Sequence, residues 1–167
     1  MNSNPIDRKA EKMSEVDIEV VSLDVKKIML ATDGSSPSVE AIKYAVALAK
    51  LLQAELVALY VDEQFALLQE EKYEEELYEG VKHSAAGLQV AQWYGEKNGI
   101  EVKTILKQGS APKKIIATAK EEEADLIVIG TTGRTGLKRI AIGSVAEMVM
   151  KAAHVPVMVI RNFKVRS

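Results

Sequence analysis

The chain has 167 residues, the length of one ordinary domain, and its 47% hydrophobic content can fill a single core. Lysine and arginine number 22 against 24 acidic residues, so no global positive field draws the chain to nucleic acid or anionic lipid. Cysteine is absent, which excludes disulfides, thiolate metal sites and a cysteine nucleophile. Because the chain has no global positive field, a bound anion must be held by local groups.

The N-terminal segment looks like neither a targeting signal nor a membrane anchor. Residues 1–30 carry no apolar core followed by a small-residue cleavage site. No apolar run in the chain approaches the roughly 20 residues that a membrane-spanning helix needs. These features predict a cytoplasmic protein with no membrane or nucleic-acid partner. We interpret residues 1–24 as an N-terminal arm of unknown use and residues 25–167 as one domain.

From residue 25 onward, short β-branched runs alternate with longer helical patterns, which is typical of βαβ units that build a parallel sheet. The first, fourth and fifth runs are almost continuously apolar, as strands covered by helices on both faces should be. The predicted strands cover residues 25–32, 55–62, 100–107, 125–130 and 155–161.

Helix start and stop signals separate these strands. Ser36 and Pro37 indicate an N-cap and a first helical position after the first strand, and Gly99 indicates the end of the longest helix. Apolar residues recur at helical spacing between these signals. The predicted helices cover residues 36–52, 72–98, 110–123 and 143–153.

Five parallel strands joined by right-handed helical crossovers make an α/β fold, an open doubly wound sheet with helices on both faces. We predict the strand order 3-2-1-4-5. In this order the winding reverses between the first and fourth strands, and ligands bind at such a point, beyond the carboxyl ends of the strands. The loops that leave these two strands begin with residues 31–34 and 130–133, which the topology thus predicts as the site.

The segment with the strongest chemical signal is residues 130–144, GTTGRTGLKRIAIGS, which leaves a buried strand and enters a helix. Glycine lets a phosphate approach backbone N–H groups because no Cβ intervenes. The first N–H groups of the following helix, at Gly143, Ser144 and Val145, have no intrahelical partner and lie at the positive end of the helix dipole. We therefore expect a phosphate group there, with the Ser144 hydroxyl as a further donor.

The loop is neither a Walker A sequence nor a G-x-G-x-x-G fingerprint, because the required spacings are missing. Its pattern is G-x-x-G, nine residues, then G-S, formed by Gly130, Gly133, Gly143 and Ser144. With this pattern, the first strand and its Asp-Gly-Ser turn (residues 28–35, IMLATDGS) and the last strand (residues 155–161, VPVMVIR), the sequence resembles the ATP-binding branch of the universal stress protein family. The resemblance covers about residues 25–161.

The resemblance implies ATP as the ligand, with Mg²⁺ held through its phosphates. It implies that Asp33 contacts the adenosine and that Ala31 and Val61 line the base pocket. Arg134, in a loop that also carries Lys138 and Arg139, is a candidate to neutralise phosphate charge. The predicted site residues are Ala31, Asp33, Val61, Gly130, Thr131, Gly133, Arg134, Gly143, Ser144 and Val145. The alternative reading of Asp33 is a simple turn-former.

Nucleotide binding that changes what the surface presents to an unidentified protein partner, as a stress or signalling module, is the predicted function. No residue stands out as a general base, so we name no catalytic residue and expect at most a weak ATPase. A slow ATPase or nucleotide hydrolase is the first alternative. A flavodoxin-like flavin carrier is the second, disfavoured by the 5% aromatic content. With histidine only at His83 and His154 and no cysteine, we predict no protein-made metal site.

The last predicted strand lies at one edge of the sheet, and its apolar residues favour pairing with a second chain. We therefore predict a homodimer through the C-terminal edge strand, as in relatives of the family. Three methionines in this part of the chain, Met148, Met150 and Met158, are interpreted as core filling.

Overall fold

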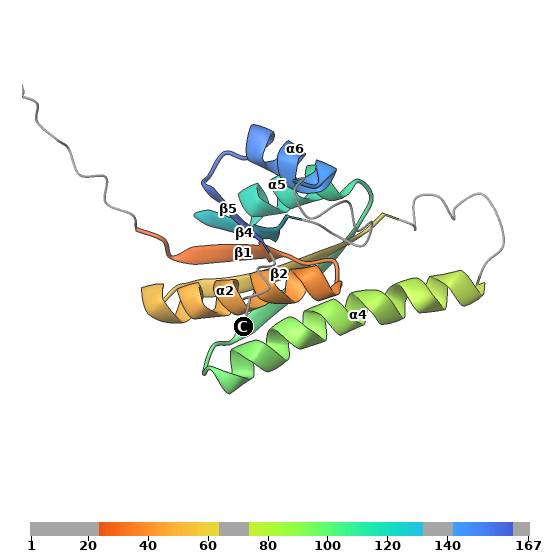
Figure 1. Cartoon of the computed structure of the whole chain (residues 1–167), viewed down its shortest axis with the longest axis horizontal. Coiled ribbons are helices and arrows are strands. Elements are labelled where there is room, and N and C mark those ends of the chain that lie inside the picture. The colour runs from red at the N-terminus through yellow and green to blue at the C-terminus, as the bar shows by residue number, and fades with distance from the viewer. Residues whose placement is uncertain (1–23, 64–73, 132–141, 162–167) are drawn as a thin grey trace, which may run out of the picture.

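The computed structural model describes residues 24–63, 74–131 and 142–161. A parallel five-stranded sheet in the order β3-β2-β1-β4-β5 lies between two layers of helices (Figure 1). The predicted fold class and strand order are confirmed. The elements are β1 Lys27–Ala31, α2 Ser36–Leu52, β2 Glu55–Asp62, α4 Glu74–Lys97, β3 Val102–Gln108, α5 Ala111–Glu121, β4 Leu126–Gly130, α6 Ser144–Ala152 and β5 Val157–Ile160.

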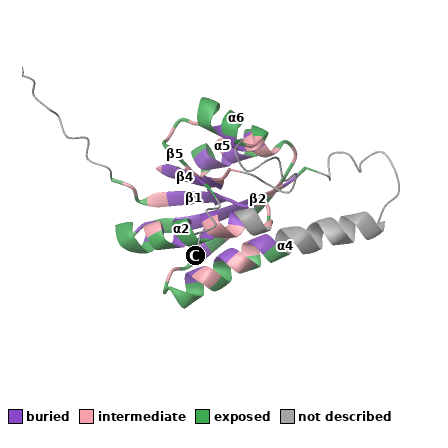
Figure 2. Ribbon diagram, viewed as in Figure 1, coloured by how far each residue is buried: buried purple, intermediate pink, exposed green. Residues whose placement is uncertain are grey.

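The sheet has a hydrophobic core on each face, because successive residues of a strand point to opposite sides. In β1, Ile28 and Leu30 pack in the core covered by α2 and α4, whereas Met29 and Ala31 pack in the core covered by α5 and α6. Figure 2 shows the resulting band of buried residues along the central strands. This two-sided burial explains why β1 is continuously apolar from Ile28 to Ala31 rather than alternating.

The edge strand β5 departs from the prediction. It has four residues, shorter than expected, and within the described residues only β4 pairs with it. Met148, Met150 and Met158 are 50%, 38% and 36% exposed, so their interpretation as core filling is wrong. An edge strand and the outer side of α6 are covered on one side only, which the apolar character of the residues does not reveal.

Hydrogen bonds donated by backbone N–H groups explain two of the other shifted element ends. The Asp125 carboxylate accepts the N–H groups of Lys26 and Lys27 at 2.8 and 2.9 Å, so Asp125 caps β1 instead of starting β4. The N–H of Ile100 donates to the carbonyl of Gly95 at 2.9 Å in the turn that ends α4, which delays β3. The N-cap of α2 is Ser35, not Ser36 as predicted.

Several sequence predictions fall outside the described residues. Residues 1–23, nearly all of the predicted arm, are among these, as are residues 64–73, 132–141 and 162–167. None of the helices in the described part of the chain has the length and apolar character needed to cross a membrane.

Thr118 offers a test of the packing between α5 and the sheet. Its hydroxyl is buried and has no hydrogen-bond partner among the described residues. Burying an unpaired hydroxyl is unfavourable, so we expect Thr118→Val to raise the free energy of unfolding by about 1 kcal/mol. Urea denaturation measures the change, with Thr118→Ala as the control that leaves a cavity. A lower stability of Thr118→Val would show that the hydroxyl has a partner.

Candidate functional site

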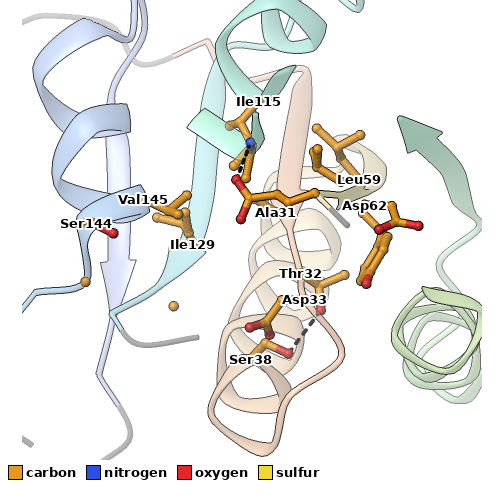
Figure 3. A pocket seen from close by; sticks show the side chains of 16 residues that line it. Ala31, Thr32, Asp33, Ser38, Leu59, Asp62, Ile115, Ile129, Ser144 and Val145 are labelled. Carbon is orange, nitrogen blue, oxygen red and sulfur yellow. Dashed lines mark hydrogen bonds between the residues drawn. The ribbon is translucent and has the colours of Figure 1, made fainter. Parts of the chain in front are cut away.

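A cavity of about 390 Å³ opens at the carboxyl ends of β1, β2 and β4, where the strand order reverses (Figure 3). Its walls come from the ends of these strands and from the beginnings of α2, α5 and α6. The residues that line it are Ala31, Thr32, Asp33, Ser38, Leu59, Tyr60, Val61, Asp62, Glu63, Ala111, Ile115, Ile129, Gly130, Gly143, Ser144 and Val145.

Seven of the ten predicted site residues line this one cavity, although they come from distant parts of the chain. These seven are Ala31, Asp33, Val61, Gly130, Gly143, Ser144 and Val145. Thr131 is not among the lining residues, and it directly follows β4, which ends at Gly130. Gly133 and Arg134 lie outside the described residues, as do Lys138 and Arg139. Ligand contact by all ten predicted site residues stays a prediction.

The turn that carries Asp33 is fixed by its own hydrogen bonds. The Asp33 carboxylate accepts the Ser35 N–H at 3.0 Å and the Ser35 hydroxyl at 2.5 Å. Asp33 therefore does act as a turn-former, the alternative reading of its role. The turn nevertheless places Asp33 on the wall of the cavity, so both roles are compatible.

A buried hydroxyl pair lies beneath the same turn. The Thr32 hydroxyl donates to Ser38 Oγ at 3.0 Å and accepts the N–H of Gly34 at 3.3 Å. The Ser38 hydroxyl in turn donates to the Ser35 carbonyl at 2.7 Å. Because buried polar groups are costly to leave unpaired, this chain of bonds specifies one geometry for the turn.

The opposite end of the cavity is the N-terminus of α6. Gly143 is its N-cap, with φ −64° and ψ 153°, and within the described residues no side chain caps the helix. The Gly143 N–H donates to the Thr131 carbonyl at 2.6 Å. Our expectation that this N–H is available to a phosphate is therefore wrong. The N–H groups of Ser144, Val145 and Ala146 remain as donors, since they have no intrahelical acceptor.

Thr131 acts through its backbone at the base of the glycine-rich segment. Its carbonyl accepts the Gly143 N–H, and its own N–H donates to the Ile160 carbonyl at 2.9 Å. The two bonds attach the start of α6 to the ends of β4 and β5. Thr131 therefore fixes where α6 begins relative to the cavity.

Carboxylates gather at the ends of β1 and β2. Asp33, Asp62 and Glu63 all line the cavity, and Glu63 Oε1 accepts the Ala111 N–H at 2.8 Å. This bond joins the end of β2 to the N-terminus of α5. Among the described residues, no group of three or more His, Cys, Asp or Glu side chains is placed to hold a metal ion.

A fourth carboxylate lies in the first turn of α6. Lys151 donates to Glu147 Oε1 at 2.6 Å, and this hydrogen bond, followed by the charge of the ammonium group, lowers the pKa of Glu147. Glu147 therefore stays ionised but paired, which limits its repulsion of an anion near the start of the helix.

Sequence reasoning missed part of the lining. Asp62 and Glu63 had a usable signal, since they end the strand next to β1 in the predicted order. Ala111 and Ile115, from α5, had none, because apolar residues at a helix start carry no chemical signature. Thr32 and Ser38 are small polar residues whose burial only the packed structure shows.

Comparisons with known proteins agree on one family. Residues 24–161 match the Universal stress protein family. Universal stress protein MJ0531 of Methanocaldococcus jannaschii is 42% identical over 142 residues, which cover 83% of this chain and 84% of that protein. The solved structure of MJ0577, from the same organism, superposes with a TM-score of 0.70 at 31% identity, covering 84% of this chain and 98% of that one.

A more distant neighbour shares the fold. The universal stress protein from Archaeoglobus fulgidus, solved in complex with dAMP, has a TM-score of 0.62 at 24% identity. The match covers 81% of this chain and 98% of that chain.

Proposed function

Because this chain belongs to the universal stress protein family, we propose that it binds ATP in the cavity at the carboxyl ends of β1, β2 and β4. The observation that carries the proposal is the meeting of Asp33, Val61 and the start of α6 on one cavity of about 390 Å³. A volume of this order is typical of small-molecule sites. The nucleotide would act as the signal in a stress or signalling response.

The charges of the cavity favour one orientation of the nucleotide. Asp33 and Asp62 lie at the ends of β1 and β2, whereas Ser144 and Val145 lie across the cavity at the N-terminus of α6 (Figure 3). Glu63, which also lines the cavity, follows Asp62 in the chain. Carboxylates accept hydrogen bonds from ribose hydroxyls and an exocyclic amino group but repel phosphates. N–H groups at a helix N-terminus attract phosphates. We therefore place the adenosine by the carboxylates and the phosphates by α6.

Apolar residues between these two ends would contact the adenine ring. Ala31, Leu59, Ile115 and Ile129 are apolar residues of the cavity lining. The Archaeoglobus fulgidus protein shares the fold of this chain, and its structure in complex with dAMP contains an adenine nucleotide bound by that protein. Mg²⁺ would enter with the phosphates, which supply oxygen ligands of the kind it prefers.

Calorimetry tests ligand choice directly. We expect the protein to bind ATP with Mg²⁺ more tightly than NAD or FMN. The cavity offers donors for phosphates, and the glycine-rich sequence of residues 130–144 lacks the spacing of a dinucleotide fingerprint. Mass spectrometry of small molecules released on denaturation supplies an independent measurement. Tighter binding of FMN, with a coloured protein, would favour the flavin-carrier alternative instead.

Turnover should be slow. The Asp33 carboxylate already accepts two bonds from Ser35, and the Glu63 carboxylate accepts the Ala111 N–H at the start of α5. In the orientation proposed above, the cavity carboxylates lie with the adenosine rather than beside the phosphates, so we expect phosphate release far below the roughly 10 per second of a typical enzyme. A rate near that value, abolished by one site substitution, would favour the ATPase alternative.

The proposal also includes assembly and location. The outer edge of β5 has no strand paired with it among the described residues, and Met158 on this strand is 36% exposed. An open apolar edge favours pairing with the same edge of a second chain, so we propose a homodimer through β5. A cytoplasmic location, where ATP is abundant, and an unidentified protein partner belong to the same proposal.

A further inference from the structure

Helix α4 passes directly against the turn that carries Asp33. Gly87, a buried glycine of α4, lies so close to Gly34 that an added Cβ would be 2.8 Å from Gly34 Cα and 2.9 Å from Gly34 N. It would also lie 3.7 Å from Thr32 Oγ1. Real Cβ atoms essentially never approach backbone atoms to less than 3.0 Å. Any side chain at position 87 must therefore displace the turn or the helix.

The turn has little freedom to yield. Gly34 has a φ of +72°, a conformation that few residues other than glycine adopt. Its N–H, the atom that the Cβ would press on, donates to the Thr32 hydroxyl, which in turn bonds to buried Ser38. A shift of Gly34 would therefore also disturb Thr32 and move the adjacent Asp33.

We propose that Gly87 is a positioning residue for the nucleotide site, and that α4 and the Asp33–Gly34 turn move as one unit. The inference rests on the proposed binding of ATP. Gly87 does not line the cavity, so it would act on the site only through the turn that carries Asp33, which does. Coupling between two elements is reciprocal. A nucleotide that holds the turn also holds α4, and a displacement of α4 lowers nucleotide affinity.

The chain offers a matched control on the same helix. Gly95 is also a buried glycine of α4, and an added Cβ would clash with Val102 Cγ2 and with the carbonyl oxygen of Ile100, at 2.6 Å from the latter. These contacts lie at the other end of the sheet from the cavity, where β3 begins. Alanine has a higher helix propensity than glycine at both positions, so that effect cancels in the comparison.

Calorimetry with Mg²⁺ and ATP compares the two variants at a temperature where both are folded. We expect Gly87→Ala to weaken ATP binding by about tenfold or more, because the site loses its preorganised turn. Gly95→Ala should lower the melting temperature while its dissociation constant stays within about twofold of the parent. Equal ATP affinity of Gly87→Ala and the parent would overturn the inference.

Amide NMR without ligand separates this inference from the proposed function. The signals of Asp33, Gly34 and Ser35 should shift in Gly87→Ala and stay in place in Gly95→Ala. If the parent binds no ATP, the proposed function fails, and these shifts alone decide whether Gly87 positions the turn. If Gly87→Ala does not fold, the parent is titrated with ATP instead. The Gly87 amide should then move while the Gly95 amide does not, and an unmoved Gly87 amide would contradict the coupling.

Discussion

Replacing Ser144 by proline is expected to weaken ATP binding by about tenfold or more, since the loss of a phosphate-binding N–H in a charge-assisted bond costs about 1.5–3 kcal/mol. Ser144 is the first residue of α6, where proline fits the helix and removes only a donor that has no intrahelical acceptor. The preceding residue, Gly143, has φ −64° and ψ 153°, the conformation that a following proline requires. The fold should therefore persist, and calorimetry with Mg²⁺ and ATP measures the loss.

Ser144→Ala is the matched control, because it removes the hydroxyl and keeps the N–H. The difference between the two variants isolates the backbone donor, and circular dichroism verifies that α6 is intact in both. ATP affinity that is the same in Ser144→Pro and Ser144→Ala would show that the phosphates do not lie at the start of α6.

Proline in β5 should separate folding from dimerisation. The Ile127 N–H donates to the Pro156 carbonyl at 3.0 Å, and the Thr131 N–H donates to the Ile160 carbonyl at 2.9 Å. Residues 156 and 160 thus face β4, and because the direction alternates along a strand, Met158 also faces β4 and Val157 faces the open edge. Met158→Pro removes an N–H that faces β4 and so leaves a buried carbonyl of β4 unpaired, which should destabilise the fold by about 1–3 kcal/mol. Val157→Pro should keep the fold and weaken the dimer.

Light scattering measures the mass of the parent and of Val157→Pro, and urea denaturation measures the stability of both variants. The parent should have twice the chain mass of 18.3 kDa, and Val157→Pro should approach the single-chain mass with ATP binding retained. A parent of 18.3 kDa would refute the dimer. A Val157→Pro variant that remains dimeric would place the interface on another surface.

The fold was predictable because its signals are local. A strand covered on both faces is apolar where it is buried, as β1 is from Ile28 to Ala31. The helices between the strands are indicated by the spacing of their apolar residues and by a glycine or serine at one end. Right-handed crossovers then leave few possible strand orders. The place of the cavity followed from the order, because the winding reverses between β1 and β4.

The site was predictable in part. Residues that carry a chemical signature after a strand or before a helix, such as Asp33 and Gly143, were found, and they line the cavity. Ala111 and Ile115 were not, because an apolar side chain is a cavity wall only if another element leaves space beside it. Asp62 and Glu63 were also missed, although the predicted strand order already placed the end of β2 beside the end of β1.

The sequence by itself determined which segments are strands, in what order they pair and at which end of the sheet the cavity opens, because spacing and turn chemistry act over a few residues. Only the tertiary structure decided how particular groups are used. It engaged the Gly143 N–H with Thr131, exposed Met158 at the sheet edge, and brought Gly87 against Gly34. Each of these depends on two segments that meet through packing, and the contact distance between them is set by the whole core rather than by either segment's residues.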